Sequence, residues 1–501
     1  MDIQIFDIEK CLNSLWAQEC IHDIYEAGVH NDKLPLLYLE NNGKCSIKIN
    51  DGKSERIDLK NISMQGAVWG SLYCTTTMDK LAKIMYKEDE LLYKYKGVVD
   101  TPCLGMVDDL LIFQKCSTKS VKVNAVVNAF VEMKKLKFNK DKCYRIHIGK
   151  QSRKSPPCPE VKVHADTMKN STKEKYLGDI IDKNCVSKAT IESRKSKGYA
   201  AVSEILAILK DIPLGEHKME IGLHLRQAML LNAILYNSEG WHNVADEDLK
   251  ALESIDEHLL RSLVQGQAKT PLEFLYLETG AIPIRHIISG RRTMYLQTIL
   301  KRGENEITRR ILLAQKADPS PGDFVKLVES DLKKLNLPME YEDIESMNVE
   351  FFKNMVKKKV KEAAFKHLQA LQDTHSKIRN IKYLELKCQP YILSSIFTNE
   401  DVNLLHSLRG RSVNCKANFR NRYGDDISCP LCTSGEADDQ PHFLACTKIL
   451  ENLSTSEVVK QKVQYDDIFG EPLEQKQVTV LFRKLLDIRK ELLEKQNETE
   501  D

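Results

Sequence analysis

Polar and apolar residues alternate over residues 1–6, which predicts a β-strand that runs directly into Asp7. Further along, residues 104–113 contain two short apolar runs with two adjacent carboxylates, Asp108 and Asp109, between them. This pattern predicts two strands joined by a tight turn, with both carboxylates at its tip. Acidic side chains that are far apart in the chain are therefore expected at the ends of strands.

Apolar residues at helical spacing dominate much of the remaining chain. We expect helices from about residue 70 to residue 95, over residues 120–137 and 478–493, and through most of the region after residue 191. One more short strand is expected at residues 144–148, and a short strand pair around Gly178 is expected at residues 176–181. The predicted fold class is α+β, with a small sheet followed by a mostly helical region.

Composition places the chain among ordinary globular proteins, since 42% of its 501 residues are hydrophobic and 29% are charged. The first residues carry no basic segment typical of a secretory signal, and the longest uncharged run, residues 61–78, contains too many polar residues for a membrane span. Most of the 14 cysteines are dispersed, as in proteins with reduced thiols. We therefore expect an intracellular protein, nuclear or cytoplasmic and not secreted, with no membrane partner.

The paired carboxylates Asp108 and Asp109 offer hard oxygen ligands that can share a divalent cation, although a plain surface turn also uses aspartate. Gln65 and Gly66 lie in a glycine-containing loop, where a backbone can approach a ligand closely and an amide can bind a base edge or a sugar. Lys142 follows a predicted helix and can donate a proton or hold a phosphate, or simply face solvent.

These residues, together with residues 176–178, occur in the order and approximate spacing of reverse-transcriptase motifs A to E. The chain resembles a non-LTR (LINE-type) retrotransposon reverse transcriptase from residue 3 to about 182, and more weakly to about 450. The resemblance implies the palm of the polymerase right-hand fold, followed by a helical thumb. It also implies an RNA-directed DNA polymerase that extends a DNA primer or target on an RNA template, using deoxyribonucleotides.

The resemblance also assigns roles to individual residues. Asp7, Asp108 and Asp109 would bind two Mg²⁺ ions, and Lys142 would be the general acid for the leaving pyrophosphate. Gln65 and Gly66 would line the nucleotide and template site. Leu12 stands where the family usually has an aromatic ring under the incoming sugar, so selection of deoxyribonucleotides is expected to differ.

Asp7 lies six residues from Met1, so we expect the fingers that precede motif A in the family to be missing and the palm to be incomplete. The predicted regions are the palm at 1–182, a helical thumb and post-thumb region at 183–320, a helical basic region at 321–425, a zinc knuckle at 426–450, and a C-terminal helix with an acidic tail at 451–501.

Residues 351–420 hold 14 Lys and Arg against 5 Asp and Glu, an excess that suits a polyanion, although a solvated helix face would look the same. The stretch ends in arginines interleaved with aromatic residues, a mixture suited to phosphate contacts and base stacking. The predicted nucleic-acid-binding arginines are Arg409, Arg411, Arg420 and Arg422.

Directly after the arginines come Cys429 and Cys432, and then His442 and Cys446. Two thiolates on a short turn followed by a His/Cys pair can close a tetrahedral zinc site and fold a segment too small for its own core. The position matches the Cys-Cys-His-Cys knuckle that follows the reverse transcriptase in several LINE-type families. One Zn²⁺ is therefore expected here.

Two other functions stay open on the sequence. One is a catalytically inactive fragment or recruited nucleic-acid-binding protein that uses the thumb, the basic stretch and the knuckle. The other is a zinc-dependent protein-interaction module. The sequence leaves both the enzymatic activity of this chain and its oligomeric state open.

Overall fold

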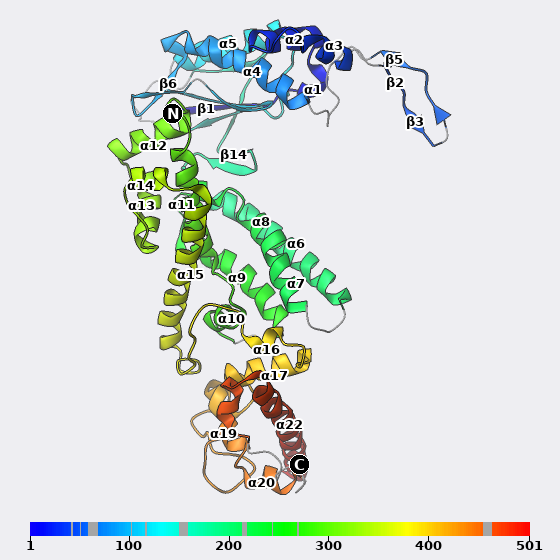
Figure 1. Ribbon diagram of the computed structural model, residues 1–501, viewed down its shortest axis with the longest axis vertical. Coiled ribbons are helices and arrows are strands. Elements are labelled where there is room, and N and C mark those ends of the chain that lie inside the picture. The colour runs from blue at the N-terminus through cyan, green and yellow to red at the C-terminus, as the bar shows by residue number, and fades with distance from the viewer. Residues whose placement is uncertain are drawn as a thin grey trace. The chain divides into compact units, whose positions relative to one another are not determined.

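The computed structural model describes residues 1–41, 44–50, 52–58, 69–101, 103–115, 118–149, 159–212, 218–242, 244–267, 270–453 and 463–500 (Figure 1). The chain divides into two compact units. The first comprises Met1–Thr190, Trp241–Asn243 and Lys301–Leu327, and the second comprises Ile191–Gly240, Val244–Leu300 and Val328–Asp501. The boundary predicted at residue 320 therefore falls inside the first unit.

A five-stranded sheet organises the first unit, with strand order β13-β10-β1-β9-β8. Its strands are β1 (Asp2–Phe6), β8 (Leu104–Met106), β9 (Asp109–Gln114), β10 (Tyr144–His147) and β13 (Lys169–Ser171). Strand β1 lies in the middle and pairs antiparallel with both β9 and β10. The chain's first strand is thus covered on both edges by strands more than a hundred residues away.

The two faces of this sheet follow from the alternation of side chains along a strand. Phe6, Leu110 and Ile112 pack into a core with residues of α2 (Ala17–Glu26), α4 (Gly70–Tyr86) and α5 (Thr118–Met133). These helices lie on one side of the sheet (Figure 1). Ile3 and Leu111 point to the other face, which is covered in part by the hairpin of β14 (Lys173–Tyr176) and β15 (Asp179–Asp182). The sheet is therefore sandwiched between helices and a hairpin.

The remaining elements of the first unit are short strand pairs and helices. The helices are α1 (Cys11–Ser14), α2 (Ala17–Glu26), α3 (Leu34–Asn41), α4 (Gly70–Tyr86), α5 (Thr118–Met133) and α12 (Ile307–Ala317). The strands are β2 (Lys44–Cys45), β3 (Lys48–Ile49), β4 (Gly52–Lys53), β5 (Ile57–Asp58), β6 (Tyr93–Tyr95), β7 (Val99–Thr101), β11 (Lys162–Val163), β12 (Asp166–Thr167), β14 (Lys173–Tyr176) and β15 (Asp179–Asp182).

The prediction of a helix that reaches residue 95 is wrong at its end, because α4 ends at Tyr86. Residues 93–95 instead form strand β6, which pairs with β7 across a turn that contains Gly97. Aromatic residues at alternating positions, such as Tyr93 and Tyr95, are typical of a strand and favour β6 over a longer helix.

The second unit is helical. Its helices are α6 (Lys188–Asp211), α7 (Lys218–Leu225), α8 (Leu231–Ile234), α9 (Asp246–Leu263), α10 (Leu272–Thr279), α11 (Ile284–Leu300), α13 (Phe324–Lys334), α14 (Tyr341–Ser346), α15 (Val349–Thr374), α16 (Pro390–Leu393), α17 (Asn399–Arg409), α18 (Arg420–Tyr423), α19 (Gln440–Phe443), α20 (Thr447–Glu451) and α22 (Pro472–Glu500). Helices α6 and α13 begin in the first unit.

Helix α15 illustrates how the sequence builds this unit. The Asn348 side chain accepts hydrogen bonds from the backbone N–H groups of Glu350 and Phe351, which caps the helix. Apolar residues then recur every four positions along one buried stripe. Gly290 lies on α11 where a Cβ atom would come within 2.8 Å of the Val360 side chain, so α11 approaches α15 closely.

One continuous core extends from α9, α10 and α15 to α17 and α22. It also contains Phe443, Cys446 and Ile449 of the Cys/His segment. That segment therefore packs against a larger apolar core that other helices of the second unit build. Among the described residues, no helix is both long and apolar enough to cross a membrane.

Candidate functional site

The carboxylates predicted to share a metal lie at one end of the sheet of the first unit. Strand β1 pairs with β9 so that Phe6 faces Leu110, which brings Asp7 beside Asp109. In the β8–β9 hairpin Met106 pairs with Asp109, so the turn consists of Val107 and Asp108. Only Asp108 therefore lies at the tip of the turn, and Asp109 begins the second strand.

Lys142 joins this group from the other side of β1. Its Nζ atom lies 3.7 Å from Oδ1 of Asp7. The loop that carries it is tied to Asp7 by the backbone, since the N–H of Asn139 donates to the carbonyl oxygen of Asp7 at 2.8 Å. The Asp7 N–H also contacts Sγ of Cys143 at 3.5 Å. Backbone contacts thus hold the lysine beside the carboxylate.

The electrostatics at this end of the sheet favour a cation. Burial raises the pKa of Asp109, and the negative charges of Asp108 and Asp7 raise it further, while Lys142 lowers it. Three carboxylates here face one ammonium group, so the edge is anionic. The carboxylate oxygens do not approach one another as closely as the potential ligand atoms of a Cys/His group in the second unit. Among the described residues, that group is the one set of at least three His, Cys, Asp or Glu side chains close enough to share a metal ion.

The surroundings of the carboxylates are partly described. Leu12 lies on α1 and packs half-buried against the core of the first unit. Gln65 and Gly66 lie outside the described residues. On the far face of the sheet, the hydroxyl of Tyr176 lies 3.5 Å from the carbonyl oxygens of Leu104 and Asp109. Burial raises the pKa of Tyr176 to about 12, so the hydroxyl keeps its proton and can donate.

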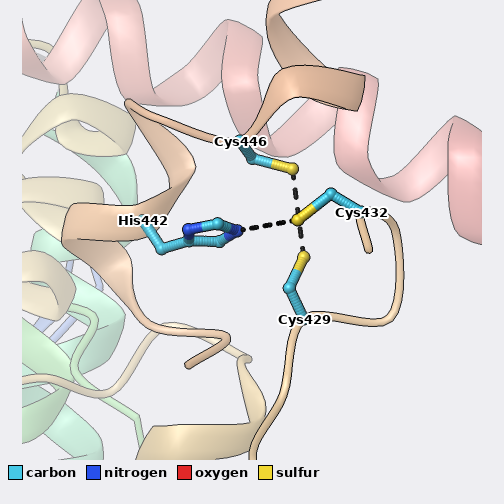
Figure 2. A group of neighbouring side chains, drawn as sticks. All are labelled: Cys429, Cys432, His442 and Cys446. Carbon is cyan, nitrogen blue, oxygen red and sulfur yellow. Dashed lines mark hydrogen bonds between the residues drawn. The ribbon is translucent and has the colours of Figure 1, made fainter. Parts of the chain in front are cut away.

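A second site gathers Cys429, Cys432, His442 and Cys446 in the second unit (Figure 2). One potential ligand atom of each residue lies within 4.8 Å of those of the other three. Sγ of Cys432 is 3.4 Å from Nε2 of His442, and Sγ of Cys429 is 3.9 Å from Sγ of Cys446. Three sulfur atoms and one imidazole nitrogen are a donor set that suits tetrahedral zinc. The cluster could therefore bind one zinc ion.

The pKa shifts differ between the thiols of the cluster, since burial raises the pKa of Cys446 to about 11. Hydrogen bonds with Ser434 lower the pKa of Cys432 to about 6, which makes it a thiolate at neutral pH. Nδ1 of His442 lies 2.8 Å from a carboxylate oxygen of Glu436, which leaves Nε2 facing the sulfur atoms. A carboxylate that accepts from the second ring nitrogen is the usual partner of a metal-binding histidine.

Local backbone structure positions the four ligands. The N–H of Cys429 donates to the carbonyl oxygen of Glu436 at 2.8 Å, closing a short loop around the first two cysteines. The Asp439 side chain accepts from the N–H of His442 at 2.9 Å and caps α19. Arg489 of α22 binds Asp438 at 2.7 Å, which anchors the loop to the core.

The arginines predicted to bind nucleic acid fall into two classes. Arg409 is only 5% exposed and forms a two-pronged ion pair with Glu278, at 2.9 and 3.0 Å. Since this pair satisfies a buried charge, we remove Arg409 from the candidate phosphate ligands. Arg411, Arg420 and Arg422 are exposed and line a single cavity of about 660 Å³.

Sequence reasoning missed three residues that matter here. Glu278 lies in a segment, residues 275–280, to which the pattern assigned no chemistry. Glu436 orients His442, and its only sequence signal is an acidic residue between the second cysteine and the histidine. Lys377 belongs to the basic stretch 351–420 but lies more than thirty residues before the exposed arginines, so only the tertiary structure shows that it lines the same cavity.

Comparison with known proteins adds no family assignment, because no protein-family model and no curated protein matches the chain.

Proposed function

We propose that this chain is the polymerase region of an RNA-directed DNA polymerase of the non-LTR retrotransposon type. The observation that carries the proposal is that Asp7, Asp108, Asp109 and Lys142 meet at one end of the strands of a sheet. They come from positions up to 135 residues apart. This is the residue set, in the order, that the resemblance assigns to nucleotidyl transfer. An anionic edge beside one ammonium group is what a metal-dependent phosphoryl transfer requires.

Each residue has a definite task in the proposed reaction. Asp7, Asp108 and Asp109 would hold two Mg²⁺ ions, which supply charge stabilisation for the attacking and leaving oxygens when bound. Lys142, exposed beside Asp7, would donate a proton to the departing pyrophosphate. Leu12 would lie under the sugar, where an aliphatic side chain covers less area than an aromatic ring.

Primer extension tests this proposal directly. The purified chain is incubated with Mg²⁺, a DNA primer on an RNA template and labelled deoxyribonucleotides. We expect incorporation, and a loss of at least about 100-fold in the Asp109→Asn variant, comparable with the loss of a key electrostatic group in other enzymes. Asp89→Asn is the matched control, because that exposed carboxylate pairs with Lys94 and lies near the opposite end of β9, where Gln114 donates to the carbonyl oxygen of Leu91. No incorporation by the unaltered chain even when a fingers segment is supplied, or full activity in Asp109→Asn, would overturn the proposal.

A second candidate function is nucleic-acid binding without catalysis. It is favoured by the Cys/His cluster and by the exposed arginines beside it. This function requires affinity that falls steeply with salt, survives Asp108→Ala and is lost in Cys429→Ser. Protein binding without nucleic-acid binding would instead favour an interaction module.

A further inference from the structure

We infer that the second unit contains a specific binding pocket for the phosphodiester backbone of single-stranded nucleic acid, and that the Cys/His cluster builds one of its walls. This inference rests on the nucleic-acid-binding part of the proposed function and adds the site. The pocket is the cavity of about 660 Å³ named above. We call it the basic pocket.

Five cationic side chains line the basic pocket. They come from two separate stretches of the chain and are Lys377, Arg379, Arg411, Arg420 and Arg422. Among the described residues, no carboxylate lies within salt-bridge distance of the four arginines. Unlike Arg409, their charges are therefore not used to satisfy a buried partner. The nearest acidic lining residue is Asp439, whose carboxylate is engaged by the N–H of His442.

One residue of the pocket lining carries a buried hydrogen-bond donor that lacks a partner. Gln440 lines the pocket and is 1% exposed. Its Oε1 atom accepts from the hydroxyl of Tyr465 at 2.9 Å, which fixes the orientation of the amide. Its Nε2 atom has no hydrogen-bond partner among the described residues. A buried donor without a partner is energetically unfavourable.

The pocket also contains an aromatic ring. Phe419 lies half-buried in its lining, and Nζ of Lys377 lies 4.9 Å from the ring centroid. Cations around an aromatic ring are the combination by which proteins hold single strands, since phosphates meet the charges and a base can stack. A duplex has no unstacked base to offer, so the pocket favours a single strand over a duplex.

The opposite wall of the pocket belongs to the Cys/His segment. Its lining residues there are Ile427, Ala437, Asp439, Gln440 and Pro441. All but the first lie between Cys432 and His442 in the sequence, so a metal ion bound by the cluster would fix both ends of this wall. Removal of the metal should therefore weaken binding although no cationic side chain has changed.

Binding of a fluorescein-labelled 12-nucleotide oligo(U) or oligo(dT) to the full chain tests the inference. We expect the double variant Arg420→Ala/Arg422→Ala to weaken binding at least tenfold, and to make the slope of log K against log salt shallower by about 1.4, since each phosphate contact to a single strand contributes about 0.7. The matched control is Lys448→Ala/Lys490→Ala, which removes two exposed charges of this unit outside the pocket and should change neither quantity.

The metal dependence is measured in the same assay. Chelation should weaken binding of the unaltered chain, and Zn²⁺ should restore it, while circular dichroism reports whether the helices persist. Gln440→Glu, which replaces the unpartnered donor by a carboxylate, should weaken binding without removing a cation.

Three results would overturn the inference: equal affinity in the pocket and control variants, equal affinity for a duplex of the same length, or full competition by inorganic polyphosphate at the same charge concentration. Primer extension by the same preparations separates the two proposals. If the unaltered chain does not extend the primer but its binding depends on the pocket arginines, only the polymerase proposal is refuted. If primer extension occurs and the pocket variant binds the oligonucleotide as tightly as the unaltered chain, only the pocket is refuted.

Discussion

The buried ion pair between Glu278 and Arg409 gives the sharpest stability prediction. Glu278 is fully buried and accepts from two nitrogens of Arg409 at 2.9 and 3.0 Å, and its carboxylate also accepts from Tyr391 at 2.6 Å and from Tyr383. Burial alone would raise the pKa of Glu278, but the Arg409 guanidinium lowers it below its usual value. The carboxylate is therefore ionised at neutral pH and links α10, α16, α17 and the segment before α16.

Glu278→Gln keeps the volume of the side chain but leaves the Arg409 charge buried without its partner. Breaking one side of a buried ion pair costs about 3–5 kcal/mol, so we expect the second unit to lose this much free energy of unfolding. Arg409→Met should be similarly destabilising, and the double variant should lose less than the sum because neither charge is left alone. If Arg409 instead bound phosphate, its removal would weaken nucleic-acid binding without lowering stability.

Urea unfolding measured with two probes isolates this effect. The three tryptophans, Trp16, Trp69 and Trp241, all belong to the first unit, so their fluorescence follows that unit. Far-UV circular dichroism is dominated by the helices of the second unit. We expect Glu278→Gln to shift the dichroism transition and leave the fluorescence transition in place.

Glu385→Gln serves as the control, because that carboxylate pairs with Lys387 at the surface and should contribute little. A dichroism midpoint in Glu278→Gln equal to that of the control would refute the reasoning. The direction in which stability changes with pH follows from the lowered pKa of Glu278. The stabilisation is present above the unfolded-state value of about 4.3 and is lost as the pH falls through the lower folded-state value.

Three further predictions address other sites. Gly280→Ala should destabilise far more than Gly97→Ala in urea unfolding, because both glycines have positive φ but only at Gly280 would an added Cβ atom clash with the backbone, at the nitrogen of Cys388. The chain should contain about one Zn²⁺ by elemental analysis, and Cys429→Ser should lose it; equal zinc in both would contradict the site. Burial lowers the pKa of His286 to about 4, so the unfolded chain binds more protons between that value and about 6.5. Stability should therefore fall as the pH drops through this range, and His286→Leu should flatten the dependence.

The parts of the site that the sequence predicts are those encoded by short-range patterns. Alternation over residues 1–6 gives a strand that ends at Asp7, and the apolar runs around Asp108 give a hairpin, as the structure has them. The spacing from Cys429 to Cys446 likewise identifies four side chains that the structure brings together. In each case the side chains are positioned by a turn or a strand within a few residues, so local propensity suffices.

Only the tertiary structure decides what the charged residues do. Arg409 and Arg411 are two positions apart in the sequence, yet one is buried against Glu278 and the other is exposed at the basic pocket. Lys377 reaches that pocket from a different stretch of the chain. Charge and spacing are the same in either role, and the difference arises from burial and pairing across long sequence separations. The sequence alone therefore determines which groups exist and their local geometry, and long-range packing determines which of them remain available to a ligand.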